Sequence, residues 1–219
     1  MKGLLIKDFK LMLNQKKFFI LIVLILGAIA CFLDFDYYFL IGYFMFICSL
    51  FTISTISYDE FDNGNAFLFT LPFSRSRYVE EKYCFGILAG TCSWFLSFVI
   101  TTIIQMINSN NFIFSDWMLS TLVMLPIMFV MLAILIPFQL KYGSENGRIA
   151  IIIFLGGGFV VCYLLANLLA QSQINFNALI SFINNVDPLI ILLIIFAICL
   201  AILFVSMKIS KQIVLKKEF

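Results

Sequence analysis

The segment Tyr58–Tyr83, with the sequence YDEFDNGNAFLFTLPFSRSRYVEEKY, interrupts an otherwise apolar chain. It holds eight charged residues, whereas the apolar segments on either side, Tyr37–Ser57 and Tyr83–Ile107, hold none. Each flanking segment is long enough to cross a bilayer as a helix, which takes about 20 apolar residues. The pattern therefore predicts a polar connection between two membrane-spanning helices.

The composition of the whole chain supports a membrane protein. Of its 219 residues, 63% are hydrophobic and only 12% are charged, against about 25% charged residues in a typical soluble domain. A globule of this size cannot bury that much apolar surface away from water. We therefore predict an integral membrane protein with one membrane domain.

Apolar runs of membrane-spanning length recur along the chain. They are continuous rather than alternating, which favours helices over the strands of a barrel. The predicted fold is all-α and polytopic: an amphipathic interfacial helix (residues 1–17), a transmembrane domain (18–207) with a cytoplasmic connection at 58–82, and a basic tail (208–219). The six predicted spans are Phe18–Leu33, Tyr37–Ser57, Tyr83–Ile107, Trp117–Phe138, Ile149–Ala170 and Leu189–Met207.

Basic residues orient these spans. All 14 Lys and Arg residues fall before the first span, after the last one, or in the two connections that share their side. The opposite side has only acids: Asp34, Asp36, Asp116 and Asp187. Since Lys and Arg accumulate in cytoplasmic loops, both termini and the 58–82 connection are predicted to be cytoplasmic. The asymmetry serves topology, and we do not interpret it as nucleic-acid binding.

The first residues, MKGLLIKDFKLMLNQKK, have the pattern of an amphipathic helix. At about 100° per residue, one face carries Leu5, Ile6, Phe9, Met12 and Leu13, and Lys7, Lys10 and Asn14 lie opposite. Two interpretations stay open, a helix lying on anionic lipid and a basic flank that only orients the first span. Leu4 and Leu11 fall on the polar side, where they could touch a partner.

The predicted spans lack the residues that several functions require. None contains Asp, Glu, Lys or Arg, and the chain has no His. Ion-driven transporters place ionisable groups within the membrane, and membrane hydrolases need comparable groups, so both classes are disfavoured. The glycines Gly156–Gly158 do not form a phosphate loop, because they lack the following Lys and Ser or Thr. No cofactor is expected on this chain.

Mild polarity remains inside the spans. Hydroxyl and amide groups could line a pathway for an amphipathic passenger, or could only join helices by hydrogen bonds. Pro126 and Pro137 are expected to kink or end the fourth span, since each removes a backbone donor. The candidate pathway residues are Ser49, Thr52, Thr55, Ser97, Thr101, Gln105 and Asn167.

The polar connection itself predicts a local structure. After a turn at Gly64, the residues that follow favour a short helix, which Pro72 ends. Ser74 or Ser76 can cap a new helix that runs through Lys82 into the third span. Aromatic and Arg side chains among charges suit docking to a soluble partner. A solvated loop is the alternative.

This connection resembles the segment that follows the second span in small ABC-2 type transporter permeases. The matching positions are Thr70, Leu71, Pro72, Ser74, Arg75, Val79, Lys82 and Tyr83. The segment Ile136–Arg148, IPFQLKYGSENGR, is similar to the second cytoplasmic loop of that family, and MKGLLIKDFKLM to its first residues. The resemblance covers the chain from end to end.

The resemblance implies a role in ATP-driven export across the bacterial cytoplasmic membrane. Two permease subunits, identical or different, pair in the lipid, and each docks onto a separate ATP-binding subunit that carries ATP and Mg²⁺. The short helix between spans two and three is the coupling helix, so the expected docking residues are Phe67, Leu71, Phe73, Arg75 and Tyr78.

Similar permeases export amphipathic peptides of the phenol-soluble modulin type, and others confer resistance to drugs or bacteriocins. A membrane scaffold or immunity protein that transports nothing, and a membrane enzyme, are the alternatives from other classes.

Overall fold

A computed structural model of the chain describes residues 2–32, 36–61, 64–108, 113–171 and 187–217. The elements in these ranges are helices, as predicted: α1 (Lys2–Asn14), α2 (Lys16–Phe32), α3 (Tyr37–Glu60), α4 (Gly64–Leu68), α5 (Arg75–Asn108), α6 (Phe114–Leu122), α7 (Met124–Gln171) and α9 (Pro188–Lys216). Residues 33–35, in the connection between the first two predicted spans, lie outside the described residues.

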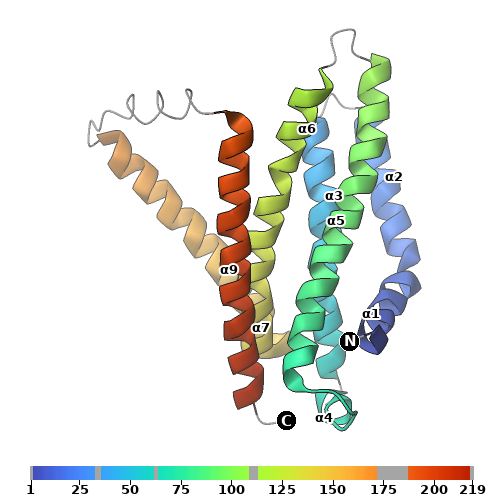
Figure 1. Cartoon of the computed structure of the whole chain (residues 1–219), viewed down its shortest axis with the longest axis vertical. Coiled ribbons are helices and arrows are strands. Elements are labelled where there is room, and N and C mark those ends of the chain that lie inside the picture. Colours follow the sequence, from blue (N-terminus) through green and yellow to red (C-terminus); the bar gives the residue numbers. More distant parts are fainter. Residues whose placement is uncertain (1, 33–35, 62–63, 109–112, 172–186, 218–219) are drawn as a thin grey trace.

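Helices α3, α5, α7 and α9 form the body of the molecule (Figure 1). The most extensive packing joins α3 to α5, then α7 to α9 and α3 to α7. Helices α1 and α2 flank the α3–α5 side and meet at a bend of 60°. After Gly143, α7 leads away from the other helices (Figure 1).

Four helical segments among the described residues are long and apolar enough to cross a membrane: α3, α5, Phe114–Gly143 and α9. A fifth is possible if α1 and α2 form one broken span, since α2 alone has only 17 residues. The predicted six spans are therefore not confirmed. Residues Ile149–Ala170, the predicted fifth span, are helical as the last part of α7.

Two helix breaks interrupt the chain between α6 and the end of α7. Helix α6 ends at Leu122, just before Pro126, because proline cannot donate to the carbonyl four residues earlier. Pro137 lies inside α7, where the backbone is interrupted instead at Gly143, with φ 76° and ψ −176°. The prediction of a break is thus confirmed near Pro126, while the second break falls at a glycine, which tolerates positive φ.

Close contacts between helix backbones build the centre of the bundle. A Cβ added to Gly86 would lie 2.9 Å from atoms of both Leu132 on α7 and Thr52 on α3. Tyr83, one turn earlier on α5, bonds through its hydroxyl to Ser206 at 2.7 Å and Ser210 at 2.9 Å on α9. Small residues and buried hydroxyls commonly hold membrane helices together.

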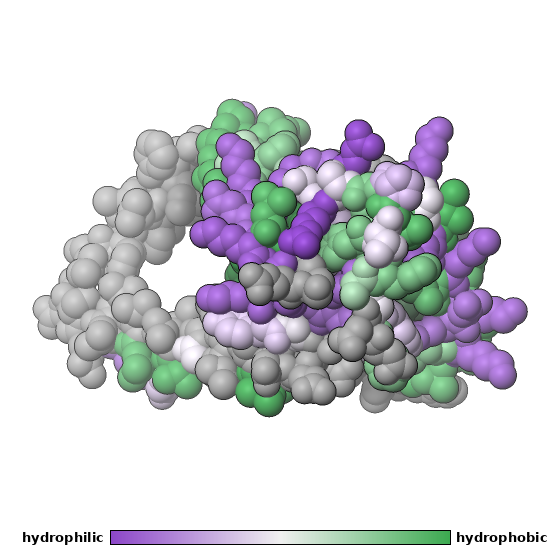
Figure 2. Space-filling model, turned by 90° about the horizontal axis from the view of Figure 1, so that it is seen from below, coloured by the Kyte–Doolittle hydropathy of each residue, from purple (hydrophilic) through white to green (hydrophobic). Residues whose placement is uncertain are grey.

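One end of the bundle gathers the polar features. Both described ends of the chain and α4 lie there, and the end of α5 and the start of α6 lie at the opposite end (Figure 1). Seen from below, this end mixes hydrophilic surface with apolar patches (Figure 2). The described ends of the chain thus lie on the same side of the bundle as α4. That both termini are cytoplasmic stays a prediction.

Candidate functional site: a connection held by buried charges

The connection between α3 and α5 has the predicted layout of short helix, turn and capped helix. Gly64 starts α4, where a Cβ would lie 2.8 Å from the carbonyl oxygen of Asp59, so only glycine fits without a shift. Helix α4 is a single turn and ends at Leu68. Helix α5 then begins at Arg75, and the backbone N–H of Arg77 donates to the Ser74 hydroxyl at 3.4 Å and to its carbonyl at 3.0 Å.

The five predicted docking residues do not share one surface. Phe67 and Leu71 are 72% and 43% exposed, and neighbouring Phe61 is 71% exposed. Phe73 is half-buried and packs against the core. Tyr78 is buried and donates its hydroxyl proton to Asp59 at 3.2 Å. The outward apolar surface of the connection is therefore Phe61, Phe67 and Leu71, and Tyr78 belongs to the interior.

Arg75 contacts the end of α9. Its guanidinium donates to the carbonyl oxygens of Val214 and Leu215 at 3.3 Å and of Lys217 at 2.8 Å, and it stacks over Phe69 at 5.5 Å. The last carbonyls of a helix have no partner within the helix, and a cation there is favoured by the helix dipole. Arg75 thus ties the start of α5 to the C-terminus of α9.

Two ion pairs reinforce this junction. Lys217 binds Glu60 at the end of α3 at 3.1 Å and the carbonyl oxygen of Leu140 on α7 at 3.2 Å. Lys211 on α9 binds Glu80 on α5 at 2.5 Å. The last turns of α9 therefore contact α3, α5 and α7 near the connection.

A buried charge network lies directly inside the connection. Lys82 on α5 is fully buried, and its ammonium group binds Asp8 on α1 at 2.5 Å and Asp59 on α3 at 2.8 Å. It also donates to the Thr55 hydroxyl at 3.1 Å. A buried charge is tolerated when it is paired and hydrogen-bonded, and these partners supply both conditions.

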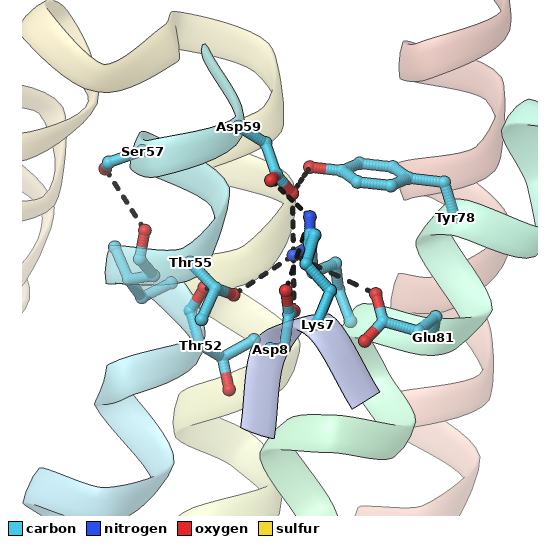
Figure 3. A network of polar contacts seen from close by, with 10 residues as sticks. Lys7, Asp8, Thr52, Thr55, Ser57, Asp59, Tyr78 and Glu81 are labelled. Carbon is cyan, nitrogen blue, oxygen red and sulfur yellow. Dashed lines mark hydrogen bonds and ion pairs between the residues drawn. The ribbon is translucent and has the colours of Figure 1, made fainter. Parts of the chain in front are cut away.

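A second lysine completes the network. Lys7, next to Asp8 on α1, binds Asp59 and lies 3.4 Å from the other oxygen of Asp8. Figure 3 shows Lys7, Asp8, Asp59 and Tyr78 converging from α1, α3 and α5. Three helices are thus joined by ionic contacts at the level where the connection leaves the bundle.

Glu81 lies beside this network with fewer partners. Its side chain is fully buried, and its carboxylate lies 3.8 Å from the ammonium group of Lys82. Neither of its oxygens has a hydrogen bond to another described residue. No group of His, Cys, Asp or Glu within the described ranges is arranged to hold a metal ion.

Helix α1 confirms the amphipathic pattern in part. Ile6, Phe9 and Leu13 are exposed on its apolar face. Leu4 is buried, and Leu11 packs against the cluster of Phe51, Phe85 and Ala89. The two leucines that fell on the polar side therefore contact the chain's own bundle, and they accompany Asp8 into it. A position of α1 at the lipid surface stays a prediction.

Comparison with known families decides what this architecture belongs to. The family described as ABC-2 family transporter protein matches residues 3–214, nearly the whole chain. The chain belongs to the ABC-2 family. No curated protein and no solved structure shows a significant match. Members of the ABC-2 family are membrane-spanning transporter subunits, and membership implies a partner subunit that binds ATP.

The candidate pathway residues of this ABC-2 permease have different surroundings, and their role in a pathway stays a prediction. Thr55 is part of the charge network. Ser49 and Thr52 are buried on the α3 surface that α5 contacts through Gly90 and Gly86. Ser97 and Thr101 donate to carbonyls of their own helix at 2.5 and 2.8 Å, Gln105 is half-buried, and Asn167 is exposed on the last part of α7.

Sequence reasoning missed Asp8, Asp59 and Lys82 as a functional unit. From the sequence alone, Lys82 is named only as part of the helix that enters the third span and as a position that matches the family, and Asp8 is not singled out. One signal was present: Asp8 is the only acid among the first 33 residues, in a stretch with five lysines. A lone acid in a basic helix points to a specific basic partner elsewhere.

Proposed function

We propose that this ABC-2 permease is the membrane-spanning subunit of an ATP-driven exporter in the bacterial cytoplasmic membrane. The partner ATPase docks on the surface formed by Phe61, Phe67 and Leu71. The main support is that these apolar side chains are 71%, 72% and 43% exposed although they lie on a polar connection. Aromatic side chains that fill a pocket on a partner supply much of the binding energy of an interface.

The contacts around the connection support a mechanical role for it. A displacement of α4 acts at once on α3 and α5, which it joins. The Lys82 network extends the displacement to α1, and Arg75 extends it to α9. Closure of the ATPase subunits then moves four helices together.

The cargo we propose is an amphipathic or hydrophobic peptide of the phenol-soluble modulin type. In support, α5 carries no charged residue from Tyr83 to Asn108, nor does α3 from Tyr37 to Tyr58. The polar groups along these stretches are hydroxyls and amides. A permease whose helices carry no charge along these stretches suits a passenger that is largely apolar.

Co-purification tests the docking surface. The native chain, Phe67→Ser and Ile113→Ser are each purified in detergent after co-expression with a candidate ABC ATP-binding subunit from the same organism. Ile113 is the matched control, because it is 61% exposed but directly precedes α6, whose start lies at the opposite end of the bundle (Figure 1). Loss of an aromatic anchor costs about 2 kcal/mol or more, roughly 30-fold in affinity.

Capture by the native chain and Ile113→Ser, but not by Phe67→Ser, is the expected result. Equal capture by all three contradicts docking at this surface. If even the native chain captures no ATPase, the exporter proposal fails and the scaffold or immunity alternative takes its place.

A second assay addresses the cargo. The assembled complex in proteoliposomes is given an amphipathic helical peptide or a scrambled peptide of the same composition. We expect the amphipathic peptide alone to stimulate ATP hydrolysis. Equal stimulation by both peptides contradicts recognition of an amphipathic helix.

A further inference from the structure

An apolar cavity of about 250 Å³ lies between α2, α3 and α5. Its walls include Val23 and Gly27 on α2, Leu40 on α3, and Leu96 and Ile100 on α5. Its volume exceeds the roughly 150 Å³ of an engineered apolar cavity that binds benzene. The space is therefore large enough for a segment of hydrocarbon chain.

The walls of this cavity are apolar and therefore favour a hydrocarbon guest. Two hydroxyl residues contribute to them, Ser97 and Thr101. Both donate their protons to carbonyl oxygens one turn earlier on α5, so neither directs a donor into the space. Apolar cavities of this kind stay dry and accept apolar guests.

The mouth of the cavity opens on the outer surface of the helices. Val23, Leu96 and Ile100 line the cavity and are also 48%, 58% and 54% exposed. In a membrane-spanning segment, that outer surface faces the acyl chains. A guest can therefore enter sideways from the bilayer.

A stripe of exposed residues on one face of α2 runs from Lys16 to the cavity. Lys16, Ile20, Val23 and Gly27 are spaced by four, three and four residues, which places them on one helix face. All four are exposed. At 1.5 Å per residue, Val23 and Gly27 lie about 10 and 16 Å along the helix from Lys16. This range reaches from the interface to about the bilayer midplane, since one leaflet is about half of the 30 Å hydrocarbon core.

We propose that this cavity binds one acyl chain of an anionic phospholipid, whose phosphate is held by Lys16 and Lys17 at the start of α2. The lysines supply the charge complementarity, and the stripe supplies the path from headgroup to cavity. The site is separate from the ATPase-docking surface, and the proposal does not depend on the exported cargo.

Gly27 allows the cavity to be filled without damage to the bundle. A Cβ at Gly27 has nothing within 4 Å, and the same is true at Gly156 on α7, outside the cavity. Gly27→Leu therefore places a side chain in or across the cavity, and Gly156→Leu is the matched control. Both replace a helical glycine by a better helix former, which favours folding.

Photo-crosslinking provides the test. Each variant of the full chain is reconstituted in phosphatidylcholine vesicles. The vesicles contain a trace of phosphatidylglycerol that carries a photoreactive diazirine in one acyl chain. After illumination, the labelled residues are mapped by mass spectrometry. We expect label concentrated on residues 23–27 and 96–104, at least fivefold lower in Gly27→Leu and unchanged in Gly156→Leu. When the probe is instead phosphatidylcholine with the same diazirine, labelling of the cavity residues in the native chain should also be at least fivefold lower, because its headgroup is not anionic.

Three results would overturn the proposal. One is label spread evenly over all lipid-facing helices. Another is label in the cavity that Gly27→Leu leaves unchanged. The third is cavity residues that crosslink only to a second copy of the chain or to an added amphipathic peptide, since the occupant would then be protein and not lipid.

Discussion

Lys82→Met tests whether the buried charge network holds the connection in place. The substitution removes an ammonium group that is fully buried and bound to Asp8 at 2.5 Å and to Asp59 at 2.8 Å. Removing one partner of a buried ion pair costs about 3–5 kcal/mol, because the remaining charge is left uncompensated. Lys7 still contacts both carboxylates, so we expect the lower end, about 3 kcal/mol.

Lys211→Met is the matched control. Its ion pair with Glu80 has the same 2.5 Å separation between nitrogen and oxygen, but the two side chains are 25% and 35% exposed. Exposed pairs contribute about 0–1 kcal/mol. The two variants thus remove the same group at the same distance and differ in burial.

The free energy of unfolding is measured in mixed detergent micelles from the fluorescence of Trp94 and Trp117, which report on contacts between α5 and α6. The reasoning is refuted if Lys82→Met lowers the free energy of unfolding no more than Lys211→Met does. Adding Asp8→Asn to Lys82→Met leaves Lys7 paired with Asp59, so the double variant should unfold less easily than Lys82→Met alone.

Two further predictions concern helix packing and the α9 junction. Gly86→Ala should lower the free energy of unfolding by about 1–3 kcal/mol, because the added methyl group overpacks against Leu132. Its control Gly156→Ala lies in open space and should be neutral or stabilising. Equal melting temperatures of the two variants would contradict this. Arg75→Ala should speed amide hydrogen exchange at residues 211–217 about tenfold or more, because hydrogen bonds to a charged group contribute about 1.5–3 kcal/mol. Arg77→Ala, at an exposed position, is the control. Exchange in Arg75→Ala that is as slow as in this control would contradict the junction between α5 and α9.

The sequence predicted the local structure of the connection well. A glycine turn, a proline break and a serine cap act through their nearest neighbours, so a short helix and a new helix after Ser74 could be expected. Helix α4 differs in its bounds, because it includes Gly64 and ends at Leu68, before Pro72. Ion pairs between distant segments leave no such local pattern. Asp8 and Lys82 are 74 positions apart, and only the fold brings them together.

The position of Tyr78 illustrates a signal that was available. Tyr78, Glu81, Lys82 and Phe85 follow the spacing of one helix face, and all four are buried. That spacing predicts that Tyr78 points inward with Lys82. The expectation that it contacts an ATPase came from the family resemblance and not from helix geometry.

The separation of Asp8 and Lys82 also has a consequence for biosynthesis. Helix α1 leaves the ribosome before α5, so its buried carboxylate gains its lysine partner only 74 residues later. At about 5–20 residues per second, the interval is about 4–15 s. During this time α1 can associate with the membrane but cannot seat against the bundle. The last step of N-terminal folding therefore waits for the helix that follows the connection.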